Sequence, residues 1–86
     1  MSKRKYVNSV EQMRKQTQQI TADCAMITFY NVDPIPANAI TINGLPVAGG
    51  GGFVAFDGKE DEEDITQYTV VSVRPQYTFV LRKKYV

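Results

Sequence analysis

The chain has 86 residues, 43% of them hydrophobic and 22% charged, which is enough for one small domain with one modest core. It contains no His, no Trp and one Cys, Cys24, so most of the side chains that carry out acid–base, metal or nucleophilic chemistry near neutral pH are missing. A lone Cys excludes an intrachain disulfide and with it the disulfide-stapled secreted class. We therefore expect no enzymatic activity and no cofactor, and a Cys24 that behaves as a small buried hydrophobic residue.

The two ends of the chain and its middle differ in charge. Residues 1–19 carry a net charge of +4, residues 20–70 carry −7 and residues 71–86 carry +4, although the whole chain is only +1. Such asymmetry indicates docking to a protein of opposite charge or loose contact with a polyanion, while a solvated terminus explains the basic start equally well. Polar residues follow this basic start, and no apolar run approaches the roughly 20 residues that cross a bilayer. We expect synthesis in the cytoplasm and no membrane contact.

Residues 1–20 are expected to form a basic N-terminal arm or a short helix. Val10, Met13 and Ile20 follow a sparse helical spacing, and a Ser-x-x-Gln pattern from Ser9 fits the start of a capping box. The apolar stripe is thin, so an extended arm that becomes ordered against a neighbour fits the pattern as well as a helix does.

The rest of the chain, residues 21–86, reads as short β-strands separated by Gly and Pro. Residues 24–32 are rich in β-branched and aromatic side chains and predict a central strand, which two prolines at residues 33–36 end. Asn43 and Gly44 lie between two apolar runs and predict a tight hairpin, because a type I′ turn requires positive φ at both positions.

The second arm of this hairpin contains Pro46, which predicts an edge strand. The four glycines at residues 49–52 then predict a flexible connection, whose backbone needs unusual φ angles or a close approach by a neighbour. A short strand at residues 53–56 is followed by a hydrated acidic loop at residues 57–64.

The last two strands, residues 65–73 and 77–86, are joined by a turn and are expected to pair as antiparallel neighbours. One row of alternating apolar side chains in the final strand is expected to face the core: Tyr77, Phe79, Leu81 and Tyr85. These elements together predict an all-β fold, a small antiparallel β-sandwich or barrel of about five or six strands in residues 21–86. The N-terminal arm or short helix of residues 1–20 precedes it.

Three binding hypotheses find weaker support. No Gly-Lys-Ser/Thr follows the four glycines, so a phosphate-binding loop is not expected, and the consecutive acids lack the ligand spacing of a calcium loop. A small β-barrel that binds single-stranded nucleic acid stays open as the alternative, although the acidic middle of the chain repels phosphate. The last strand supplies the residue types for it: Tyr77, Phe79, Arg82, Lys83, Lys84 and Tyr85.

The segments follow one another in a definite order: Phe-Tyr-Asn-Val at residues 29–32, the hairpin at 40–47, the glycine-rich turn, the strand at 53–56, the acidic loop and Val-Leu-Arg-Lys at 80–83. Over residues 27–84 this order resembles small virion structural proteins of tailed bacteriophages, including those of the crAss-like gut phages. The resemblance implies a non-enzymatic β-sandwich in a virion, in a capsid auxiliary, connector or fibre-attachment role. It also implies other virion proteins as partners and an oligomeric assembly.

Docking is expected to use two charged segments, the basic start of the chain and the end of the acidic loop. The predicted docking residues are Lys3, Arg4, Lys5, Glu60, Asp61, Glu62, Glu63 and Asp64. A host-cell regulatory or adaptor domain is the third functional hypothesis.

Overall fold

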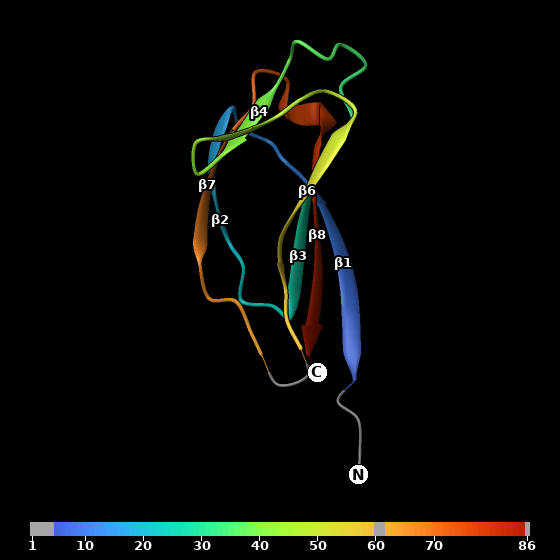
Figure 1. Cartoon of the computed structure of the whole chain (residues 1–86), viewed down its shortest axis with the longest axis vertical. Helices are drawn as coiled ribbons and strands as arrows, with labels where there is room; N and C mark the ends of the chain where they lie inside the picture. The colour runs from blue at the N-terminus through green and yellow to red at the C-terminus, as the bar shows by residue number, and fades with distance from the viewer. Residues whose placement is uncertain (1–4, 60–61, 86) are drawn as a thin grey trace.

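The computed structural model describes residues 5–59 and 62–85, which form two four-stranded antiparallel sheets packed as a β-sandwich (Figure 1). The first sheet has the order β1 (Tyr6–Gln12), β8 (Thr78–Tyr85), β3 (Met26–Asn31), β6 (Gly51–Asp57). The second has the order β2 (Thr17–Thr21), β7 (Gln67–Val71), β4 (Ile40–Ile42), β5 (Leu45–Val47). A short 3₁₀ helix, η1 (Pro75–Tyr77), precedes β8. The predicted β-sandwich is confirmed: β3 to β8 are the six strands that the described residues form after residue 21, and the N-terminal segment adds β1 and β2.

The described part of the N-terminal segment forms strands, so of the two predicted alternatives, an extended arm or a short helix, the helix is wrong. β1 pairs with β8 along its whole length, and β2 pairs with β7 in the other sheet. The helical spacing was accidental, because Met13 and Ile20 are buried in the core while Val10 is 67% exposed on a strand. Residues 5–20 therefore belong to the sandwich and supply one strand to each sheet.

The strands β7 and β8 lie in different sheets, so the prediction that they pair with each other is wrong. The chain crosses between the sheets at Ser72, which is buried. Its backbone N–H donates to the carbonyl of Gln16 at 2.7 Å, and its hydroxyl accepts from the hydroxyl of Thr78 at 2.9 Å. Because these bonds satisfy the polar groups of the crossing, the chain can pass through the interior without leaving them unpaired.

The core lies between the sheets. Ile27 and Phe29 of β3 and Val80 of β8 are fully buried, and the Phe29 ring meets the Tyr68 ring edge-on from the other sheet, at 5.4 Å between centroids. Side chains alternate along a strand, so burial of Thr78 and Val80 sends the row that contains Phe79 to the outer face. The prediction that Tyr77, Phe79, Leu81 and Tyr85 face the core is therefore wrong.

The hairpin at β4 and β5 is confirmed. Asn43 and Gly44 have φ values of 49° and 87°, as a type I′ turn requires. The Asn43 side-chain oxygen also accepts the Thr69 backbone N–H at 2.8 Å, which ties the turn to β7. Pro46 lies in β5, the edge strand of its sheet, as predicted.

The glycine run is only partly a connection, because Gly51 and Gly52 already belong to β6. A Cβ added at Gly49 would lie 2.4 Å from the carbonyl oxygen of Ile35, and Gly50 has a φ of 85°. The expectation of close approach and unusual φ is thus confirmed at these two positions.

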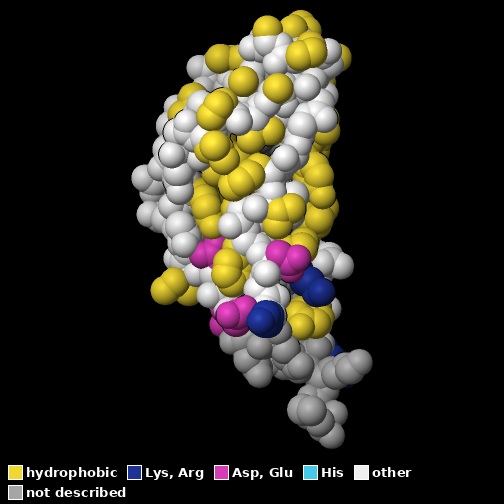
Figure 2. Space-filling model, in the orientation of Figure 1, with side chains coloured by type: hydrophobic (Ala, Val, Ile, Leu, Met, Phe, Trp, Pro, Cys, Tyr) yellow, Lys and Arg dark blue, Asp and Glu magenta, His cyan; other side chains and the backbone are white. Residues whose placement is uncertain are grey.

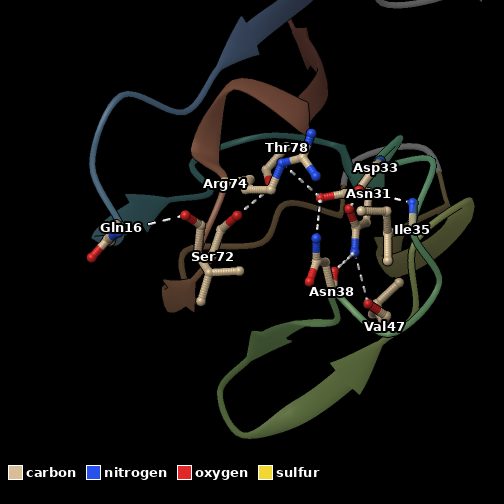
Figure 3. A network of polar contacts seen from close by, with 10 residues as sticks. Gln16, Asn31, Asp33, Ile35, Asn38, Val47, Ser72, Arg74 and Thr78 are labelled. Atoms are coloured by element: carbon tan, nitrogen blue, oxygen red, sulfur yellow. Dashed lines mark hydrogen bonds and ion pairs between the residues drawn. The ribbon is translucent and has the colours of Figure 1, made fainter.

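A buried polar network fixes the β3–β4 connection at one end of the sandwich (Figure 3). Asn31, 1% exposed, donates from its side-chain amide to the carbonyls of Asn38 at 2.9 Å and Val47 at 3.0 Å. Asp33, 2% exposed, forms an ion pair with the Arg74 guanidinium at 3.4 Å. These contacts join the two sheets through a loop that has no regular structure of its own.

Candidate functional site

The predicted docking residues have different environments. Lys3, Arg4, Glu60 and Asp61 lie outside the described residues. Lys5, Glu62 and Glu63 are exposed. Asp64 is only 6% exposed and bonds to its own chain, so its prediction as part of an exposed docking surface is wrong.

The start of β1, the end of β8 and Lys59 lie together at one end of the sandwich. Tyr6 opens β1 and contacts Tyr85 at 4.9 Å between ring centroids, and the Tyr85 hydroxyl donates to the Lys59 carbonyl at 3.3 Å. Lys83 places its ammonium 4.1 Å from the centre of the Tyr6 ring. On the face seen in Figure 2, the charged side chains lie toward the lower end, and hydrophobic side chains are scattered among uncharged polar and backbone atoms above them.

Asp64 stabilises the start of β7. Its carboxylate accepts the Thr66 backbone N–H at 2.9 Å and the hydroxyl of Tyr68, and its backbone forms a two-way bridge with Cys24. Burial alone would raise the pKa of Asp64, but the hydrogen bonds from Thr66 and Tyr68 hold that pKa below its usual value. Burial, followed by the hydrogen bond to Asp64, raises the pKa of Tyr68 to about 12. Burial likewise raises the pKa of the Cys24 thiol, which is buried as predicted.

Tyr68 should make the protein sensitive to alkaline pH. Because its pKa is raised from 10.0 to about 12 in the fold, its contribution to stability is complete below pH 10 and is lost as the pH rises through about 12. We expect Tyr68→Phe to lower the free energy of unfolding at pH 7 by about 1–3 kcal/mol, since it removes a hydrogen bond to a buried carboxylate. The variant should also lose less stability than the parent between pH 10 and pH 12. Urea denaturation at these pH values measures both effects, and an equal alkaline loss in parent and variant would contradict the assignment.

The outer face of the first sheet is mostly apolar, although Asn8, Gln12 and Lys83 lie in the same rows of side chains. Cross-strand partners with the same orientation include Val10 with Leu81, Tyr30 with Phe79 and Thr28 with Val54. We define the outer apolar face as the following residues: Tyr6, Val10, Met26, Tyr30, Val54, Phe79, Leu81 and Tyr85. Tyr6, Val10, Tyr30 and Val54 are 39%, 67%, 41% and 55% exposed. Thr28 lies on the same face between its cross-strand partners Leu81 and Val54 and is only 5% exposed.

The outer face of the second sheet has a different composition. The register of β2, β7 and β4 places there mainly uncharged polar residues: Thr17, Gln19, Thr21, Thr41, Gln67, Thr69 and Val71. Sheets of a β-sandwich that face water on their outer side normally show such polar residues there. The outer apolar face of the first sheet departs from this rule, and large exposed apolar patches mark interaction sites.

The residues proposed for nucleic-acid binding do not share one surface. Lys83 lies in the outer row of β8, whereas Arg82 and Lys84 lie in the opposite row. Arg82 pairs with Glu11 at 3.2 Å and its side chain is 11% exposed. Tyr77 precedes the strand and is covered by the Arg74 guanidinium, 4.5 Å from the ring centre. The structure therefore divides the predicted basic and aromatic groove between two faces of the sheet.

Within residues 5–59 and 62–85, the structure has no pocket and no group of three potential metal ligands. None of the helical structure in this part of the chain is long and apolar enough to cross a membrane. Comparison with protein-family models, curated proteins and solved structures found no match.

Sequence reasoning missed the outer apolar face, although the sequence contains a signal for it. The run from Thr78 to Leu81 is apolar or uncharged at every position, without alternation of apolar and polar residues. A strand with one hydrated face would show that alternation, so a continuous run indicates that both faces are apolar. The position of β8 between β1 and β3 is needed to show which of its faces is the outer one. That face, with Phe79 and Leu81, is only partly buried in a single chain.

Proposed function

We propose that this chain is a non-enzymatic structural protein of a bacteriophage virion, which acts by docking to another virion protein. The observation that carries the docking role is the outer apolar face, which groups exposed aromatic and aliphatic side chains on one sheet while the other sheet is covered by Thr and Gln. A short chain gains stability when a neighbour covers such a face. The virion part of the proposal rests on the order of segments over residues 27–84, which resembles small virion proteins.

The energetics favour a broad, flat protein partner over a small ligand. Each half-exposed Tyr or Val that becomes fully buried contributes about 1 kcal/mol, so no single residue of the face suffices for stable binding. Several such residues together offset the entropy lost on association, provided that the partner covers the whole face. The flatness of a sheet suits another sheet or a helix, packed at the usual distance of about 10 Å.

A charged residue in the outer apolar face should abolish docking without unfolding the protein. Val54 is 55% exposed in the edge strand β6, so Val54→Asp should change the free energy of unfolding by less than about 1 kcal/mol. It should reduce incorporation into phage particles at least tenfold, since a desolvated carboxylate opposes burial. The matched control is Val71→Asp, which introduces the same charge on the outer face of the second sheet, at a residue 41% exposed. Quantitative mass spectrometry of purified particles measures incorporation.

This experiment also separates the proposed function from its alternatives. The parent chain must be found in particles of the phage that encodes it, and its absence from them would contradict the virion role. Equal incorporation of both variants would place docking elsewhere, and the next variant would neutralise Lys3, Arg4 and Lys5. If light scattering instead detects a complex with single-stranded DNA that dissociates at physiological salt, the nucleic-acid hypothesis replaces the docking role.

A further inference from the structure

We propose that two copies of this chain associate through β1, which pairs antiparallel with the β1 of the second copy and extends the first sheet across a two-fold axis. β1 is the edge strand of its sheet, and each of its seven residues is exposed. An edge strand offers a row of backbone donors and acceptors to another strand. This inference concerns the isolated protein and does not depend on the virion role.

The outward-facing backbone groups of β1 can be assigned from a hydrogen bond at its end. The Met13 N–H donates to the Thr78 carbonyl at 2.9 Å, so this opposed pair is of the hydrogen-bonded type. In an antiparallel ladder such pairs alternate with non-bonded ones, which assigns Val7, Ser9 and Glu11 to bonding with β8. The residues between them direct their N–H and C=O groups away from β8: Tyr6, Asn8, Val10 and Gln12.

The other sheet edges are less suited to strand addition. β5 has three residues and contains Pro46, and β6 contains Gly51 and Gly52 and a register irregularity against β3. Both features interrupt pairing at an edge. β2 is an edge strand of five residues without a charged side chain. β1 has seven residues, continuous register, no Pro, no Gly and a charged residue that can select a partner.

Charge and shape favour one register for the pair of β1 strands. If Asn8 lies opposite Asn8 of the second copy, Tyr6 lies opposite Val10 and Lys5 lies opposite Glu11, each twice by symmetry. Aromatic residues pair well with β-branched ones, and opposite charges pair well across strands. The Glu11 side chain is 49% exposed beside Arg82, so its carboxylate can accept a second cation. A shift of the symmetry centre to Ser9 places Glu11 opposite Val7 and loses the ion pairs.

This pairing would form three backbone-bonded residue pairs, each exchanging two hydrogen bonds, so about six bonds in total. It would also make the outer apolar faces of the two copies continuous, because Tyr6 and Val10 lie on that face and meet across the axis. The interface is small, so the dimer should be weak and concentration-dependent.

The test is the mass of the full chain measured by sedimentation equilibrium over a concentration series. We expect a monomer–dimer equilibrium in which Asn8→Pro raises the dissociation constant at least tenfold, because Pro lacks the outward donor and costs no bond to β8. Asn8→Ala is the matched control, since it keeps the N–H and should dimerise as the parent does. Circular dichroism and thermal unfolding confirm that both variants fold. A parent that stays monomeric, or a dimer that Asn8→Pro leaves unchanged, overturns the proposal.

A charge exchange tests the register. Lys5→Glu should weaken the dimer about threefold or more, because it places two acids opposite each other. The double variant Lys5→Glu/Glu11→Lys restores the opposite charges and should recover at least half of that loss, whereas salt should weaken the parent dimer. If the double variant folds but dimerises no better than Lys5→Glu, the register with Asn8 at the symmetry centre is wrong.

Discussion

Asn31→Leu should destabilise the folded protein by about 3–5 kcal/mol, because it leaves several buried polar groups without partners. The Asn31 side chain is 1% exposed. Its amide donates to the carbonyls of Asn38 and Val47, and its oxygen accepts the Asp33 N–H at 3.3 Å. Leu branches at Cγ as Asn does and is larger, so no cavity forms, and the loss comes from the missing hydrogen bonds together with overpacking. Chemical denaturation followed by circular dichroism gives the free energy of unfolding.

The matched control is Asn38→Leu in the same network. The Asn38 side chain is only half-buried and donates one hydrogen bond, to the Asp33 carboxylate at 3.2 Å. We expect it to cost about 1 kcal/mol. If the two substitutions cost the same, Asn31 does not organise the end of the sandwich as Figure 3 indicates.

The network around Asn31 also explains which parts of the fold the sequence could predict. The hairpin at Asn43 and Gly44 is specified by two adjacent residues, so local reasoning was sufficient. The pairing of β7 and β8 is not local. A turn at Pro75 is compatible with a hairpin, and only the burial of Ser72 and its bonds to Gln16 and Thr78 direct the two strands into different sheets.

The sequence did not predict the N-terminal strands, because their pairing also depends on residues far away along the chain. β1 has an exposed face on both sides, so its sequence shows neither the alternation of a half-buried strand nor a helical stripe. Its strand conformation depends on pairing with β8 at the other end of the chain, as the partners Tyr6 and Tyr85 show. Long-range pairing of this kind leaves little trace in a local window.

The candidate site was predicted in part. Charge segregation indicated two docking segments, but it could not show that Asp64 is buried or that Tyr85 at the end of β8 contacts Lys59. The outer apolar face depends on four strands that are distant in sequence, with Val10, Leu81, Thr28 and Val54 in adjacent positions. The two edge strands β1 and β6 are joined only through β8 and β3, so the face results from the sheet topology and not from any one segment.

Substitutions of the adjacent residues Phe29 and Tyr30 should affect different properties: the first lowers stability and the second weakens docking. Phe29→Ala should cost about 3–5 kcal/mol, because the ring is fully buried and its loss leaves a cavity beside Tyr68. Domains of this size lie toward the lower end of the usual range of about 5–15 kcal/mol, so this single change should leave the protein largely unfolded or close to its midpoint at room temperature. Denaturation by urea, with the midpoint compared between parent and variant, measures the effect.

Tyr30→Ala is the control on the same strand, one residue further on and on the opposite face. Tyr30 is 41% exposed and its ring covers Gly52, where an added Cβ would lie 3.1 Å from the ring. We expect a loss below about 1.5 kcal/mol and a folded protein, because the ring is only half-buried. The same variant should nevertheless show reduced incorporation into particles, since it removes an aromatic residue from the outer apolar face. If the Tyr30→Ala protein folds and is incorporated normally, Tyr30 is not part of the docking surface. If it does not fold, the outer apolar face is needed for the stability of the chain itself.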